Sequence, residues 1–145
     1  MTVSGLSGQL TADGHELVQR VYFEDTDFSG RVYHARYLHF LERGRSDYLR
    51  LLGIHHRDLA AAGLAFAVHR MEIDFLRPAS IDDVLSITTS PTAVGGARIY
   101  LLQQITRAAV RLLEAKVSVV LIGANGRPSR LPEAIRSAFR PPAAS

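Results

Sequence analysis

The 145-residue sequence contains no cysteine, no tryptophan and a single lysine, Lys116. The absence of cysteine excludes disulfides, thiolate nucleophiles and cysteine-ligated zinc sites. No apolar run approaches the roughly 18 residues that a membrane helix requires. The first residues also lack the basic and apolar segments of a secretory signal. These absences predict a cytoplasmic protein with no integral membrane segment.

The charge is close to balanced, with 17 Lys and Arg against 14 Asp and Glu and a formal net charge of +3. The arginines are scattered and do not cluster with aromatic residues, so we expect no nucleic acid partner. A weak positive field suits a small molecule that carries phosphates. The length and the 47% hydrophobic content are typical of one globular domain.

The chain divides into a short arm and one domain. Residues 1–15 are small and polar and predict a flexible N-terminal arm, which leaves 16–140 for the domain. A change of parity in the alternating run of 64–75 predicts a β-bulge near His69. The remaining patterns predict a strand over 17–23, a helix from 35 to about 52 closed by Gly53, strands over 64–75, 84–89, 97–106 and 110–122, and a short helix over 132–139.

One long helix beside consecutive strands predicts an α+β fold. Strands joined by short turns favour an antiparallel sheet, and the apolar stripe of the helix can be buried only against one face of it. We therefore expect a curved antiparallel β-sheet wrapped around a long central helix. Such a sheet has free edges, which favour pairing with a second copy.

The segment most suggestive of chemistry places Glu24, Asp25 and Asp27 just before a glycine turn and a helix. The first N–H groups of a helix are unpaired and attract oxyanions. A carbonyl bound there would be polarised while Asp25 or Asp27 attacks it or directs a water. His34 stands within reach of the same place, and Tyr33 could line it.

A structural role is the alternative for these carboxylates, since short acidic residues before helices often cap or form turns. Glu24 and Asp25 fit that role best. A calcium loop would need its bidentate glutamate at Arg36, which is a cation, so we reject it. A phosphotransferase loop would need a parallel sheet, which the pattern does not support.

The segment from Val21 to Arg50, VYFEDTDFSGRVYHARYLHFLERGRSDYLR, closely resembles the signature of hotdog-fold acyl-CoA thioesterases. The resemblance is to the hydroxybenzoyl-CoA thioesterase family, and within it to the YbgC (Tol–Pal-associated) type. It continues through Phe66–Leu85 and Arg127–Ile135. It implies a single hotdog domain that pairs edge to edge as a homodimer or homotetramer, with active sites at the interface.

The same resemblance assigns roles within the segment. It makes Asp27 the general base or nucleophile, the backbone N–H of His34 the group that polarises the carbonyl, and the His34 imidazole an orienting group. The implied reaction cleaves an acyl-CoA thioester to free acid and CoA, or acts on acyl carrier protein. It needs no metal or other cofactor, since coenzyme A is part of the substrate. Phe28 departs from the small residue common in relatives and leaves the acyl preference open.

Other polar residues have more ordinary interpretations. Tyr33 is a candidate to line the substrate pocket. The candidates to bind the CoA phosphates are Arg70, Arg77, Arg98, Arg127 and Arg130. We expect Glu42 to pair with Arg45 on the helix surface, His39 to pack, and His55 and His56 to lie in an exposed loop. A non-catalytic binding or scaffold protein is the alternative function, although the presence of both Asp27 and His34 favours an enzyme.

Overall fold

The computed structural model describes residues 5–141, which form six strands and four helical segments. No helix in that part of the chain is long and apolar enough to cross a bilayer. The elements are β1 (Gln9–Leu10), β2 (His15–Arg20), the 3-10 helix η1 (Phe23–Asp25), α1 (His34–Leu51), α2 (His56–Ala61), β3 (Ala65–Phe75), β4 (Val84–Val94), β5 (Arg98–Arg107), β6 (Val110–Ile122) and α3 (Glu133–Ala138).

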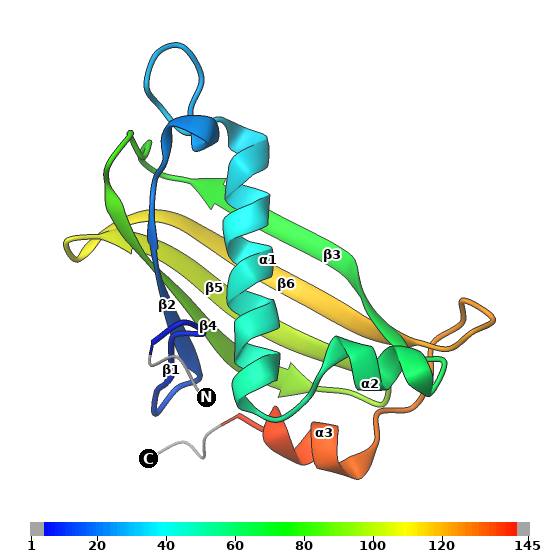
Figure 1. Ribbon diagram of the computed structural model, residues 1–145. Helices are drawn as coiled ribbons and strands as arrows, with labels where there is room; N and C mark the ends of the chain where they lie inside the picture. Colours follow the sequence, from blue (N-terminus) through cyan, green and yellow to red (C-terminus); the bar gives the residue numbers. More distant parts are fainter. Residues whose placement is uncertain (1–4, 142–145) are drawn as a thin grey trace.

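The strands form one antiparallel sheet in the order β1-β2-β4-β5-β6-β3, and α1 lies across its face (Figure 1). The predicted α+β architecture of a sheet around a long helix is therefore confirmed. Alternate residues of β6 form part of the covered face, as the sequence predicts. Ala115, Val117, Val119 and Leu121 are all buried.

The strand β3 occupies a free edge of the sheet because of how the chain crosses it. It follows the helices in sequence, yet it pairs with β6, the last strand, and not with β4. Its register shifts between Val68 and Arg70, so the predicted bulge at His69 is confirmed. An eleven-residue strand is therefore left with one side unpaired in the described chain.

The helix α1 ends where the sequence predicts, through a glycine. Gly53 has φ of +79° and donates its N–H to the carbonyl of Arg50, while Ile54 donates to Leu49. This is a Schellman motif, and the left-handed conformation favours glycine at that position. The helix is thereby stopped and the chain turns into α2.

The centre of α1 is fixed to the sheet by a polar side chain. Gln103 on β5 is fully buried and donates to the carbonyl oxygen of Leu41 and to Thr89 Oγ1, both at 2.9 Å. The same amide accepts a hydrogen bond from Arg45 Nη1 at 2.9 Å. A buried amide satisfied in this way sets both the height and the rotation of the helix.

Close approach at this point depends on Gly44. A Cβ atom added there would lie 3.0 Å from Cγ2 of Ile87 and 3.3 Å from Nε2 of Gln103. A larger side chain would therefore separate α1 from β4 and β5 and break the bonds of the amide.

The first strand differs from the prediction. The sequence places it over 17–23, whereas β2 spans His15–Arg20 and the chain bends into η1. The bend forms because the Asp25 carboxylate accepts a hydrogen bond from the Tyr22 N–H at 2.9 Å, which ends the extended backbone. Within the expected arm, residues 9–10 pair with β2 as β1, and residues 1–4 lie outside the described part.

Two further segments correct the sequence analysis. The strand β4 continues to Val94 through a second register shift beside Pro91, beyond the expected end at Thr89. His55 and His56 were expected in a loop, but His55 caps α2 and His56 opens it. This short helix forms because Leu59 is buried against the core and anchors the turn.

We predict that Gly44→Val lowers the free energy of unfolding by about 1–3 kcal/mol, the usual cost of overfilling a packed interior. Urea unfolding at fixed protein concentration measures this change, with an unaltered m-value. Arg43→Val on the exposed side of the same helix is the matched control. It should cost less than about 0.7 kcal/mol, the range of ordinary helix propensities. Equal losses in the two variants would contradict the packing role of Gly44.

Candidate active site

A tight turn carries Asp27 beyond the N-terminal end of α1. The N–H of Asp27 donates to the Arg31 carbonyl at 2.9 Å, and the Gly30 N–H donates to the Asp27 carbonyl at 3.0 Å. Gly30 has φ of +79°, which the turn requires and glycine tolerates. In Figure 1 this loop projects past the start of α1, away from the sheet.

The Asp27 carboxylate is solvent-exposed and held in one orientation. Its Oδ1 accepts hydrogen bonds from the Ser29 N–H at 2.8 Å and from Ser29 Oγ at 2.5 Å. The Ser29 hydroxyl, followed by its backbone N–H, lowers the pKa of Asp27 below the ordinary value. The lowered pKa favours the ionised form of the carboxylate, which a general base or nucleophile uses. It does not cap α1, whose N-cap residue is Tyr33.

Asp25 has the structural role that the sequence favours for it. It is buried, accepts the Tyr22 N–H, and lies 3.2 Å from Nε of Arg36 in an ion pair. The Arg36 guanidinium in turn lies 5.6 Å from the centre of the Tyr33 ring. Asp25 thus stabilises the segment that leads into α1. Of the two aspartates, Asp27 is the one whose carboxylate is exposed to solvent.

The first turn of α1 presents donors that the chain does not use. Neither the His34 N–H nor the Ala35 N–H has a hydrogen-bond acceptor within residues 5–141. The His34 ring packs edge-on against Phe75, with ring centres 4.8 Å apart. Beside it is an open hollow of about 220 Å³ lined by Val32, His34, Tyr37, Phe75, Leu76, Arg77 and Pro78.

Tyr37 forms the fixed wall of this hollow. It is buried, and its hydroxyl oxygen accepts a hydrogen bond from the Ala79 N–H at 2.9 Å. Burial raises the pKa of Tyr37, so the phenol stays protonated and neutral. The wall therefore adds no competing charge beside the helix N-terminus.

The predicted site residues do not all meet within one chain. Arg77 lies beside His34 at the hollow, whereas Asp27 does not line it. Arg70 is in the middle of β3, largely exposed and 2.5 Å from Glu72. Arg130 precedes Pro132, the N-cap residue of α3, and α3 lies near the opposite end of α1 (Figure 1). A single copy thus gathers only part of the expected site.

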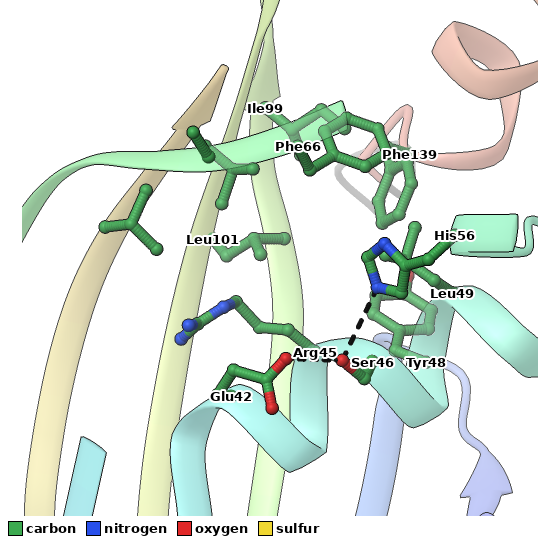
Figure 2. A pocket seen from close by; sticks show the side chains of 13 residues that line it. Glu42, Arg45, Ser46, Tyr48, Leu49, His56, Phe66, Ile99, Leu101 and Phe139 are labelled. Atoms are coloured by element: carbon green, nitrogen blue, oxygen red, sulfur yellow. Dashed lines mark hydrogen bonds between the residues drawn. The ribbon is translucent and has the colours of Figure 1, made fainter. Parts of the chain in front are cut away.

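A second pocket, of about 120 Å³, opens between α1 and β3 (Figure 2). Its polar groups are on α1 and α2, and its apolar wall comes from the sheet and from α3. The residues that line it are Glu42, Arg45, Ser46, Tyr48, Leu49, His56, Phe66, Ala67, Val68, Ile99, Leu101, Val119 and Phe139.

The polar side of this pocket overturns two expectations. Glu42 does not pair with Arg45 but accepts a hydrogen bond from Ser46 Oγ at 2.7 Å. The Arg45 guanidinium turns instead toward Gln103 on the sheet. His56 Nε2 lies 3.5 Å from Ser46 Oγ rather than in a free loop. His39, expected to pack, is exposed on α1.

Sequence analysis missed this pocket because α1 has two inward faces. The stripe assigned to the core, including Tyr37, Leu41 and Gly44, does cover the sheet. Glu42, Arg45 and Leu49 follow the same helical spacing one residue further round and face β3. The sequence signal for this pocket was the spacing of Glu42 and Arg45, which puts them on the same face of α1 as Leu49.

The antiparallel sheet around a long helix matches the hotdog fold of solved thioesterase structures. The sequence profile of the Thioesterase-like superfamily matches residues 21–139, and the chain belongs to that superfamily.

Individual relatives agree with this assignment. The chain is 40% identical over 129 residues to an acyl-CoA thioesterase YbgC of Haemophilus influenzae, covering 88% of this chain and 95% of the relative. It is 40% identical to the acyl-CoA thioester hydrolase YbgC of Escherichia coli O157:H7, covering 83% and 92%. Among solved structures, a probable thioesterase from Bartonella henselae matches with 48% identity and a TM-score of 0.78, covering 82% and 99%.

We predict that Ser29→Ala raises the pKa of Asp27 toward the ordinary carboxylate value, because the variant loses the hydroxyl donor and keeps only the backbone N–H. A carboxyl ¹³C NMR titration of Asp27 measures the shift directly. Ser29→Thr keeps a hydroxyl and should leave the midpoint low. An unchanged midpoint in Ser29→Ala would show that the hydroxyl does not stabilise the ionised form.

Proposed function

We propose that this protein hydrolyses acyl-CoA thioesters to the free acid and CoA, with Asp27 as the catalytic carboxylate. The observation that carries the proposal is the ionised, exposed Asp27, held by Ser29 on the loop that leads into the unpaired N–H groups of α1. Membership of the Thioesterase-like superfamily and the names of the YbgC relatives support the same reaction.

The chemistry divides between these groups. The carbonyl oxygen of the thioester accepts a hydrogen bond from the backbone N–H of His34, where the helix dipole favours the developing oxyanion. As a general base, Asp27 takes a proton from water while the new C–O bond forms. The C–S bond then breaks, and the proton passes to the departing CoA sulfur. As a nucleophile, Asp27 would form an anhydride that water cleaves in a second step.

The remaining site residues assist. The His34 imidazole is held against Phe75 and orients the water or the carboxylate. Arg77 lies at the same hollow and is the only one of Arg70, Arg77 and Arg130 that lines it, so it is the candidate to bind a CoA phosphate there. Arg70 and Arg130 lie farther away along β3 and beyond β6, so their contribution requires a second copy.

We infer that two copies pair through the free edge of β3. A long unpaired edge is a template for another strand, and Val68, Phe75 and Leu76 on or beside it are exposed. A full antiparallel pairing centred on Arg70 sets the Phe75 end of one copy against the Ala65 end of the other. The two Arg70 side chains would repel each other, but each is already paired with Glu72 of its own strand.

We predict that Asp27→Asn keeps the fold and lowers kcat/KM by about 100-fold or more, the usual contribution of a general base. Thiol release from short, long and aromatic acyl-CoAs measures this loss. Glu24→Gln is the matched control, because it neutralises an exposed carboxylate three residues earlier and should retain activity. His34→Ala should lose less activity than Asp27→Asn if the imidazole only orients.

Each contrary outcome has a distinct meaning. Activity retained in Asp27→Asn would remove the catalytic assignment. CoA binding without turnover on any acyl-CoA, followed by turnover on acyl carrier protein, would change the donor and keep the reaction. Binding without turnover on either donor would establish the scaffold alternative.

The absence of cysteine makes the proposed pairing directly testable. We predict that Arg70→Cys forms a disulfide-linked dimer on mild oxidation, because facing Cα atoms of antiparallel strands lie about 4.5–5.5 Å apart, within the range of disulfides. Single-cysteine variants at His69 and Met71 test neighbouring registers. Arg111→Cys, exposed near the start of β6, is the control and should stay unlinked. A monomer in sedimentation and no linkage at any of the three positions would reject the pairing.

A further inference from the structure

Arg45 is a cation without a carboxylate partner. Its Nη1 donates to Gln103 Oε1, a neutral amide, and no ion pair joins it to an acidic side chain within residues 5–141. Burial lowers the pKa of Arg45, and the negative charge of Glu42 offsets part of this decrease. A largely buried guanidinium that is bonded to an amide is free to accept an anion in a bidentate pair.

Glu42 is not the anion that pairs with the Arg45 guanidinium. Its carboxylate lines the same pocket but accepts a hydrogen bond from the Ser46 hydroxyl at 2.7 Å. In Figure 2 the Arg45 guanidinium points the other way, toward the strands and below Leu101. The Glu42 carboxylate and the Arg45 guanidinium thus point in different directions, and the guanidinium is the charged group that faces the apolar wall of the pocket.

The size of the pocket limits what the guanidinium can meet. Its volume of about 120 Å³ is somewhat below the roughly 150 Å³ of a cavity that binds benzene. Apolar side chains such as Phe66, Leu101 and Val119 form most of its wall. A short hydrocarbon segment with one anionic end would fill it and satisfy both the wall and the cation.

We propose that this pocket selects acyl groups of about five carbons that end in a carboxylate, with Arg45 binding that carboxylate. The inference rests on the proposed thioester hydrolysis and adds the substrate class. Arg45 is then a specificity-determining residue, and it takes no part in breaking the thioester bond.

The pocket must serve the catalytic carboxylate of another copy. Arg45 follows His34 by eleven residues in α1, about 16 Å along the helix at 1.5 Å per residue. A five-carbon acyl chain spans only about 5 Å, at roughly 1.2 Å per extended bond. Within one chain it cannot reach from the carbonyl site at His34 to Arg45.

Pairing through β3 would bring the carbonyl site of one copy close to the Arg45 pocket of the other. The hollow beside His34 adjoins the Phe75 end of β3, and the Arg45 pocket adjoins the Phe66–Val68 end. Antiparallel pairing sets these two ends of different copies side by side. For each substrate molecule, one copy would therefore cleave the thioester while the Arg45 pocket of the other copy binds the acyl group.

The test compares glutaryl-CoA with pentanoyl-CoA, which have five acyl carbons each and differ at the far end. We expect the unaltered protein to prefer glutaryl-CoA in kcat/KM by about tenfold or more, the effect of one charge-assisted hydrogen-bonded pair. Arg45→Met should abolish that preference, because glutaryl-CoA loses the bidentate partner of its carboxylate. Arg45→Lys should keep part of it, because an ammonium lacks the planar fork.

Arg43→Met, exposed on the same helix, is the matched control and should keep the preference. A preference for pentanoyl-CoA in the unaltered protein overturns the inference even if Arg45→Met fails to fold. Equal loss on both substrates in a folded Arg45→Met protein also overturns it, because Arg45 would then serve only the structure. Loss of pentanoyl-CoA turnover in Asp27→Asn separates these results from a failure of the proposed reaction itself.

Discussion

The amide of Gln103 is the contact on which the rest of the structure depends. It joins the middle of α1 to β4 and β5 at a depth where water cannot compete. Because Gly44 leaves no side chain between them, the helix lies low enough for that amide to reach the Leu41 carbonyl. The apolar stripe on either side can only be buried once the height and rotation of the helix are set. The same amide also directs Arg45, so the arrangement of the core determines the polarity of a pocket at the edge.

The helix carries different chemistry at its two ends. Its first turn offers unpaired N–H groups beside His34 and follows the loop of Asp27. Its fourth turn offers Arg45 and Ser46 at a small apolar pocket. Both places open toward β3. This separation explains why one copy holds only part of the proposed site, because the N–H groups proposed to bind the carbonyl and the pocket proposed to bind the acyl group lie far apart along α1.

The sequence was sufficient to predict the architecture, and it placed the turn that contains Asp27 just before α1. Alternation in β6, the stripe of α1 and the change of parity at His69 each arise from local geometry, and the structure confirms them. Local patterns failed where a distant group decides the outcome. Nothing near Arg45 indicates that it would bond Gln103, 58 residues later, in preference to Glu42. The bend at Tyr22 depends on one carboxylate hydrogen bond, which propensities do not register.

The place of β3 in the sheet also orders events during synthesis. Its only partner strand within the described chain is β6, which begins at Val110. At roughly 5–20 residues per second of translation, β3 therefore waits a few seconds without any hydrogen-bonded neighbour. Its hydrophobic residues are exposed during that interval, and the bulge at His69 forms only when β6 pairs with it. The edge of β3 that the proposed pairing uses is thus completed only when the last strand of the sheet is in place, so a pairing that depends on this folded edge would follow folding.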